Sequence, residues 1–95
     1  MSGSRQVSVD RQGEHRFLVE VVGSGLRTTH TVEVPKGLAG ELGWGDADES
    51  ELVRESFLFL LEREPASSIL PSFSLDVIGR YFPEYRKEIR RGLPA

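Results

Sequence analysis

The chain has 95 residues, of which 38% are hydrophobic and 28% charged, with a formal net charge of -3 and no cysteine. This length favours a single domain, and the lack of cysteine excludes disulfides, thiol catalysis and iron–sulfur clusters. No apolar run is long enough for a membrane-spanning helix, and the first residues lack the apolar core of a secretory signal. A cytoplasmic location is therefore expected, and the acidic balance argues against a dedicated nucleic-acid binder.

Charge is divided unevenly along the chain. Residues 1–40 hold five basic and four acidic side chains, residues 41–79 hold two and nine, and residues 80–95 hold five and two. The acidic middle and the basic C-terminal part can attract each other within one chain or between two chains. Two solvated helix faces are the simpler interpretation.

The most regular pattern in the chain is a β-hairpin. Residues 15–22 and 27–34 are rich in β-forming side chains and flank the turn signal Gly23-Ser24-Gly25-Leu26. A two-residue loop at Ser24 and Gly25 pairs Gly23 with Leu26 and fixes the rest of the register. The predicted pairs on the apolar face are Phe17 with Val32, Val19 with His30, Val21 with Thr28 and His15 with Val34. A shift by one residue would put polar side chains on this face, so the register is strongly specified.

A third strand over Val7-Ser8-Val9 is predicted beside the hairpin, with a turn near residues 10–13, and residues 1–6 are expected to be a flexible lead-in. Residues 7–95 would then form one α+β domain, with a sheet over residues 7–34 and a helical part over residues 36–91. In this fold an antiparallel hairpin or three-stranded sheet packs against one main helix plus short C-terminal helices.

The helical part is expected to begin weakly. Pro35 can open a short helix over residues 36–42, which its glycines weaken, and Trp44 is expected to fill the gap between the sheet and the helices. Asp48-Glu49-Ser50-Glu51 has the form of a capping box with Asp48 as the N-cap. It predicts the main helix, which would run to about Arg63.

The apolar residues of this main helix are spread around its axis. Val53, Phe57, Leu60 and Leu61 share one face and should point to the core. Leu52, Leu58 and Phe59 point elsewhere. The helix must therefore be covered on more than one side, either by the C-terminal segment or by a second subunit.

The C-terminal part reads as short helices separated by prolines. Pro65 ends the main helix, and residues 66–70 can add one turn. Ser74 is predicted to cap a helix over residues 75–81, with Phe73 and Ile78 as its hydrophobic staple. Pro83 begins a last helix through Arg91, which Gly92 stops.

The segment Tyr81-Phe82-Pro83-Glu84-Tyr85-Arg86-Lys87 interleaves aromatic and basic residues. It is interpreted as a helix corner, with Tyr81, Phe82 and Ile89 in the core and the basic side chains (Arg86, Lys87, Arg90 and Arg91) in water. The alternative is a surface that stacks on nucleic-acid bases.

The residues that could carry chemistry do not form a known catalytic motif. The hairpin register places His15 and His30 on the core face, where structural histidines at the rim of the sheet are expected rather than metal ligands. Asp46, Asp48 and Ser50 resemble the opening of a calcium loop, but the required glycine and bidentate carboxylate are replaced by Glu51 and Phe57. No phosphate loop, dinucleotide fingerprint or nucleophile elbow is present, so no catalytic, metal or cofactor residues are assigned.

Residues 29–63 resemble a ribbon–helix–helix motif. Thr31-Val32-Glu33-Val34-Pro35 is similar to the strand of that motif and the proline that follows it, and Ser50-Glu51-Leu52-Val53-Arg54-Glu55 is similar to the start of its second helix. In that family strands from two subunits pair into a ribbon that enters the major groove of DNA, and many members are bacterial repressors or antitoxins. The resemblance implies base-facing residues at Thr29, Thr31 and Glu33, or at His30 and Val32, and phosphate contacts at residues 48–50.

Three features of the chain differ from that family. The first helix is short and rich in glycine, the strand has a neighbouring partner in residues 15–22, and the phosphate-facing helix start is acidic. The second half of the chain is also similar to small bacterial proteins of unassigned function.

Together these patterns favour a small non-enzymatic bacterial interaction or regulatory domain that acts through protein–protein contacts, as a homodimer or with another protein. The candidate partner-binding residues are Leu58, Phe59, Asp48 and Glu49. The alternative is a ribbon–helix–helix-like DNA-binding regulator or antitoxin, with nucleic-acid contacts at Thr29, Thr31, Arg86 and Arg90. A small enzyme that uses His15 or His30 beside a carboxylate in a pocket is the third hypothesis.

Overall fold

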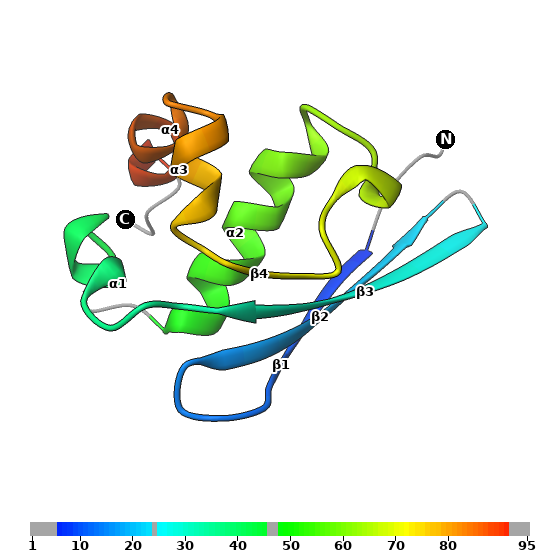
Figure 1. Ribbon diagram of the computed structural model, residues 1–95, viewed down its shortest axis with the longest axis horizontal. Helices are drawn as coiled ribbons and strands as arrows, with labels where there is room; N and C mark the ends of the chain where they lie inside the picture. The colour runs from blue at the N-terminus through cyan, green and yellow to red at the C-terminus, as the bar shows by residue number, and fades with distance from the viewer. Residues whose placement is uncertain (1–5, 24, 46–47, 92–95) are drawn as a thin grey trace.

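The computed structural model describes residues 6–23, 25–45 and 48–91, and it has an α+β arrangement in two layers (Figure 1). One layer is a four-stranded mixed sheet in the order β1-β2-β3-β4. Its strands are β1 (Gln6–Arg11), β2 (Arg16–Gly23), β3 (Leu26–Glu33) and β4 (Ser72–Ser74). The other layer holds the helices, with the long α2 (Glu49–Leu61) packed against the sheet.

The predicted hairpin register is confirmed. Strands β2 and β3 pair antiparallel, with Gly23 opposite Leu26, Phe17 opposite Val32 and Val19 opposite His30. The third strand is also confirmed, and it is longer than expected, because β1 begins at Gln6 and pairs along β2. Gln6, which was expected in the flexible lead-in, is the first residue of β1 and pairs with Val22. Residues 1–5 and Ser24 lie outside the described residues, so the lead-in over residues 1–5 and the place of Ser24 in the turn stay predictions.

The two faces of the sheet differ as the register requires. Phe17, Val19 and Val32 are fully buried on the face toward α2. The opposite face carries polar and charged side chains, and the ion pairs Arg16–Glu33 and Glu20–Arg27 lie on it. Only the inner face therefore contributes to the hydrophobic core.

The first helices begin and end near their predicted positions. Helix α1 (Leu38–Glu41) is a single turn between Gly37 and Gly43, whose φ values of +87° and +83° suit glycine. Asp48 is the N-cap of α2, as predicted, although its carboxylate accepts from the Ser50 N–H rather than from the third residue that a capping box uses. Helix α2 ends at Leu61, two residues before the predicted end.

The segment after α2 differs most from the prediction. A short 3-10 turn, η1 (Ala66–Ser68), leads into β4, which pairs parallel with β3 over Thr31–Ser72, Val32–Phe73 and Glu33–Ser74. Ser74 is thus the end of a strand and not a helix cap, and Phe73 is not part of a staple. Helix α3 (Val77–Tyr81) has Asp76 at its N-cap position. Helix α4 (Tyr85–Arg91) begins two residues after Pro83, and Gly92 lies outside the described residues.

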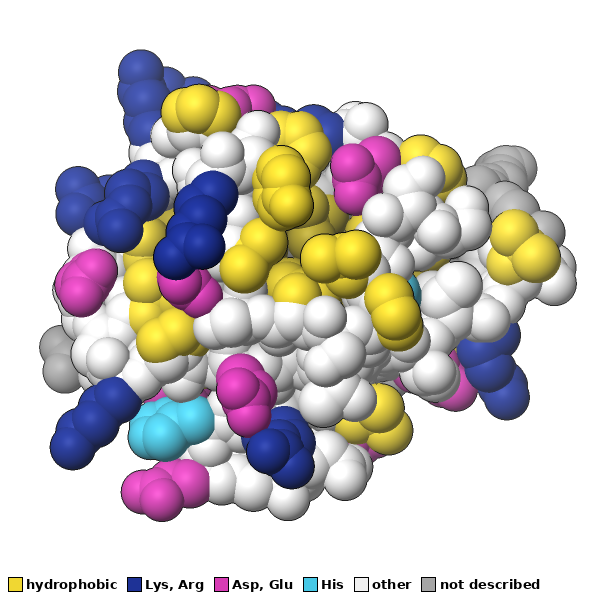
Figure 2. Space-filling model, viewed as in Figure 1, with side chains coloured by type: hydrophobic (Ala, Val, Ile, Leu, Met, Phe, Trp, Pro, Cys, Tyr) yellow, Lys and Arg dark blue, Asp and Glu magenta, His cyan; other side chains and the backbone are white. Residues whose placement is uncertain are grey.

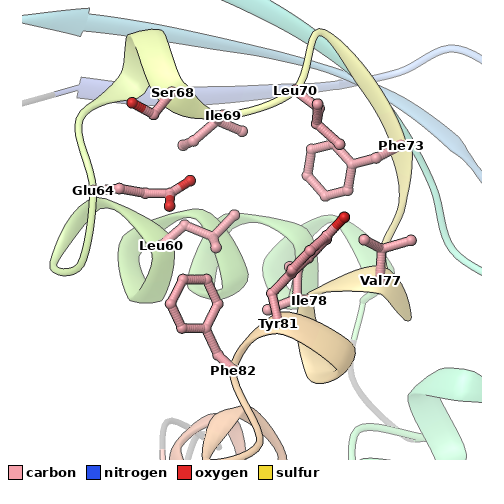
Figure 3. Close-up of a pocket in the computed structure, with 10 residues that line it drawn as sticks. All are labelled: Leu60, Glu64, Ser68, Ile69, Leu70, Phe73, Val77, Ile78, Tyr81 and Phe82. Atoms are coloured by element: carbon pink, nitrogen blue, oxygen red, sulfur yellow. The ribbon is translucent and has the colours of Figure 1, made fainter.

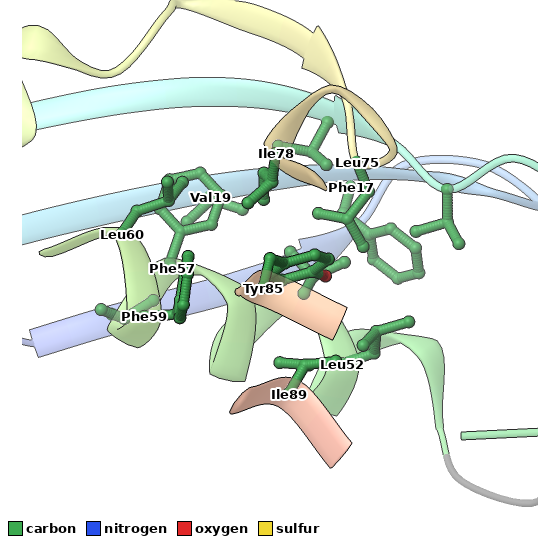
Figure 4. Packing of buried hydrophobic residues seen from close by; sticks show 14 of the residues in the cluster. Phe17, Val19, Leu52, Phe57, Phe59, Leu60, Leu75, Ile78, Tyr85 and Ile89 are labelled. Atoms are coloured by element: carbon green, nitrogen blue, oxygen red, sulfur yellow. The ribbon is translucent and has the colours of Figure 1, made fainter. Parts of the chain in front are cut away.

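The core surrounds α2 (Figure 4). On one side Phe57 packs against the rings of His30 in β3 and Phe73 in β4, at centroid distances of 5.3 Å and 5.9 Å. On another side Phe59 packs edge-on against Tyr85 of α4, at 5.2 Å. The predicted need to cover the helix on more than one side is therefore met within the chain.

The C-terminal helix is also held by polar contacts. The buried Trp44 donates from Nε1 to the Ile89 carbonyl oxygen over 3.0 Å, and Arg90 donates to the Glu41 carbonyl oxygen over 3.0 Å. Arg86 forms an ion pair with the Glu41 carboxylate at 3.6 Å. The basic C-terminal part thus contacts the acidic middle of the same chain.

A buried hydrogen bond joins α2 to α4. The Ser56 hydroxyl donates to the Leu52 carbonyl oxygen, so the Tyr85 hydroxyl, 2.6 Å away, must donate to Ser56 Oγ. Both side chains are almost completely buried. Tyr85 therefore depends on Ser56, whereas Ser56 keeps Leu52 as a partner of its own.

We expect Ser56→Ala and Tyr85→Phe to destabilise the protein unequally. Tyr85→Phe leaves Ser56 bonded to Leu52 and should lower the free energy of unfolding by about 1 kcal/mol. Ser56→Ala leaves a buried phenol without an acceptor and should cost up to about 3 kcal/mol. Urea unfolding of both variants measures the difference. A greater loss in Tyr85→Phe would contradict the assignment of Tyr85 as the donor.

The same phenol should make stability depend on pH in alkaline solution. Burial raises the pKa of Tyr85 to about 12, whereas a tyrosine in an unfolded chain has a pKa of about 10. The unfolded chain therefore loses the proton first, and the free energy of unfolding should fall as the pH rises from about 10 to about 12. Urea unfolding of the wild type and Tyr85→Phe at several alkaline pH values checks this. The fall should be shallower in Tyr85→Phe, and equal slopes would refute it.

Candidate functional site

The structure separates Leu58 from Phe59, which the sequence placed on one partner-binding stripe. Phe59 is 6% exposed, and it lies against Phe82 and Tyr85 with the Arg63 guanidinium 3.7 Å from its ring centre. Leu58 is 37% exposed and lies among charged side chains on the outer face of α2. The C-terminal helices therefore bury Phe59 and leave Leu58 exposed, so the two residues do not form one binding surface.

The acidic start of α2 is occupied by contacts within the chain. The backbone N–H of Ser50 donates to the Asp48 carboxylate and lowers its pKa. His15 Nδ1 lies 3.0 Å and 3.1 Å from the two carboxylate oxygens of Glu49, so it donates to them. Asp48 and Glu49 thus cap the helix and tie it to the loop that precedes β2. Their binding to a partner stays a prediction.

The four residues of the nucleic-acid hypothesis do not share a surface. Thr29 and Thr31 lie on the outer face of the sheet, whereas Arg86 and Arg90 lie on α4 in the helical layer, next to Glu41 (Figure 1). Strand β3 is paired with β2 along its whole length and with β4 over Thr31, Val32 and Glu33. A ribbon–helix–helix strand must offer a free edge to a second subunit, and β4 occupies this edge at Thr31 and Glu33. DNA binding stays a prediction.

The two histidines have different surroundings. His30 is buried; its Nδ1 donates to the Leu70 carbonyl oxygen over 2.8 Å, and its Nε2 is 2.9 Å from the Thr28 hydroxyl. This confirms a structural histidine. His15 is half-exposed and borders a shallow polar hollow with Glu33, Lys36 and Ser74. In the part of the chain that the structure describes, no hydroxyl is hydrogen-bonded to His15.

Metal ligation was not expected from the sequence. The described residues contain no group of three or more histidine or carboxylate side chains that could hold a metal ion. Asp46, which begins the calcium-loop-like segment, lies outside those residues.

An apolar groove is the most distinctive surface feature (Figure 3). It has a volume of about 370 Å³ and lies where the end of α2, the η1 segment, β4 and α3 meet. The residues that line it are Leu60, Glu64, Ser68, Ile69, Leu70, Phe73, Val77, Ile78, Tyr81 and Phe82. Figure 2 shows hydrophobic side chains gathered between α3 and η1 on this face, with lysine and arginine concentrated over α3 and α4.

Buried contacts hold the floor and one rim of the groove in place. Phe73 packs on Phe57, which packs on His30. His30 also holds the Leu70 carbonyl, and the Pro71 carbonyl accepts from the Thr31 N–H over 2.8 Å. The rim is therefore a fixed extension of the sheet, although the Leu70 side chain itself is 50% exposed.

The opposite rim is formed by Tyr81, which is 71% exposed. The prediction that Tyr81 lies in the core is wrong. Tyr85 of α4 fills the core in its place, and Ile89 is buried as predicted. The i, i+4 spacing of Val77 and Tyr81 is the signal that could have shown a second apolar face on α3.

The groove has one charged side chain in its lining. Glu64 is half-buried, and its carboxylate has no hydrogen-bond or ion-pair partner among residues 6–23, 25–45 and 48–91. Arg63, its neighbour, points away and pairs with Glu62 and Glu84. The groove therefore combines an apolar lining with an uncompensated negative charge.

Comparison of the chain with family models, with curated proteins and with solved structures gives no match. No helix in the described ranges is long and apolar enough to cross a membrane. Arguments about function therefore rest on the geometry of the chain itself.

Phe59 and Leu58 are neighbours whose replacement by alanine should have very different effects. Phe59→Ala removes a buried ring with two aromatic contacts and one cation contact, and should cost about 3–5 kcal/mol. Leu58→Ala removes a partly exposed side chain and should cost less than about 1 kcal/mol. Thermal unfolding of the two variants tests this. Similar losses would show that α4 does not cover Phe59 in solution.

Proposed function

We propose that this chain is a small protein–protein interaction domain that binds its partner through the groove between α2, η1, β4 and α3. The observation that carries the proposal is the groove itself, an open apolar hollow whose rims expose Leu70 and Tyr81. Apolar side chains gathered around a hollow are typical of surfaces that bind other proteins. The sequence also led us to expect a regulatory role, a bacterial source and a cytoplasmic location, and we include these three expectations in the proposal.

The chemistry of the lining favours a protein side chain over a polar metabolite. Apart from Glu64, the polar side chains among the described residues of the lining are those of Ser68 and Tyr81. Sites for small polar ligands usually converge several hydrogen-bonding groups on the ligand. The aromatic side chains of Phe73, Tyr81 and Phe82 instead match the enrichment of aromatic residues at the centres of protein interfaces. The groove thus replaces the Leu58 and Phe59 stripe as the proposed contact surface.

Peptide selection tests the proposal. A random peptide display library is selected on sparsely immobilised protein, so that copies cannot pair, and the affinities of the selected peptides are then measured for variants. We expect peptides that combine an apolar side chain with lysine or arginine, because Glu64 is unpaired. Tyr81→Ala should weaken them about tenfold or more, because an exposed aromatic rim is lost.

The matched control for this experiment is Leu58→Ala, which changes another exposed apolar side chain outside the groove. Its affinity for the peptides should equal that of the wild type. Peptides that bind Tyr81→Ala and the wild type equally well would place the binding surface elsewhere and overturn the proposal.

A further inference from the structure

Four large apolar side chains of the described residues are exposed: Leu26 at 64%, Leu58 at 37%, Leu70 at 50% and Tyr81 at 71%. Three of them lie at two places, and Leu58 lies apart on the outer face of α2. Leu70 and Tyr81 form the rims of the groove. Leu26 is the first residue of β3, at the tip of the β2–β3 hairpin. The molecule thus presents one apolar hollow and one apolar projection.

The tip of the β2–β3 hairpin projects from the rest of the molecule. Figure 1 shows the paired ends of β2 and β3 extending past the helical layer at one end of the molecule. Gly25 next to it has a φ of +77°, a conformation that suits the tight turn. Leu26 is 64% exposed, so the residues that the structure describes leave most of its side chain open to water.

The charges at the two places are opposite. Arg27 follows Leu26 and is 70% exposed, and its ion pair with Glu20, at 3.3 Å, lies at the surface. An exposed ion pair contributes little to stability, so Arg27 can exchange Glu20 for another carboxylate at small cost. Glu64 in the groove is a carboxylate without a partner among the described residues. The tip therefore carries a leucine on the inner face of the hairpin and a cation on its outer face. The groove combines an apolar hollow with an anion.

We propose that the groove binds the hairpin tip of a second copy of this chain end-on, so that Leu26 enters the hollow and the long Arg27 side chain reaches Glu64 from the other face of the strand. This inference rests on the function proposed above and names its partner. The hollow, at about 370 Å³, has room for a leucine side chain. The contact would cover three of the four exposed large apolar side chains of the described residues and would compensate the Glu64 charge. A chain of 95 residues also has a small core, which association commonly supplements.

The mass in solution as a function of concentration tests the proposal. Sedimentation equilibrium of the full chain should show association. Leu26→Ser at the tip and Tyr81→Ser at the groove should each weaken it about tenfold or more, since each loses apolar area from the same contact. Leu58→Ser is the matched control and should associate like the wild type. Thermal unfolding of each variant separates lost association from lost folding.

A mixing experiment tests which surfaces meet. Leu26→Ser keeps an intact groove and Tyr81→Ser keeps an intact tip, so an equimolar mixture should associate more strongly than either variant alone. The pairing of Arg27 with Glu64 is tested by reversing the two charges. Arg27→Glu and Glu64→Arg should each weaken association, and the double variant should recover it through a reversed ion pair.

The contrary outcomes are distinct. A wild type that stays monomeric at every concentration overturns the second copy as the occupant; if selected peptides still bind the groove, the proposed function stands with another protein as the partner. Association that Leu58→Ser abolishes and Leu26→Ser leaves unchanged moves the interface to the outer face of α2. Association without recovery in the mixture or in the charge-reversed double variant overturns the contact between tip and groove.

Discussion

Helix α2 must be buried on two sides, and most of the fold follows from this constraint. Its apolar residues surround most of the axis, so a single sheet leaves Phe59 in water. The chain meets the need by returning after Pro65, adding β4 to the sheet and placing α4 across the far side of α2. Tyr85 closes this arrangement, because its ring covers Phe59 and its hydroxyl bonds to Ser56.

Local patterns predicted the parts of the fold that depend on neighbouring residues. The hairpin register followed from a two-residue turn and the alternation of side chains, and the N-cap of α2 followed from Asp48. Strand β4 was not predictable in this way. It has only three residues, and its partner β3 lies about forty positions earlier in the chain, so nothing local distinguishes Ser72-Phe73-Ser74 from a loop before a helix. The same error made Ser74 a helix cap.

The candidate site escaped prediction for a related reason. Four elements contribute to the groove, and it exists only because β4 joins the sheet beside β3 and α3 follows it. Helical spacing showed that Leu58 and Phe59 lay off the core-facing stripe of α2, but it could not show which of them α4 would cover. Tyr81 was expected in the core and is exposed, whereas Tyr85, for which no place was predicted, is buried. Each lies on a short helix whose bounds decide which ring turns inward.

Stability and binding are linked in this architecture because the groove shares its walls with the core. Leu60, Ile69 and Ile78 are buried and also line the groove, and His30 holds the rim through the Leu70 carbonyl. An occupant that binds only the folded chain must therefore shift the unfolding equilibrium toward the folded state by mass action. In a chain with a small core, an occupied groove would then be a stabilising element of the fold as well as a contact surface. Association would thus extend the core beyond one copy, with the sheet of each molecule providing the fixed rim.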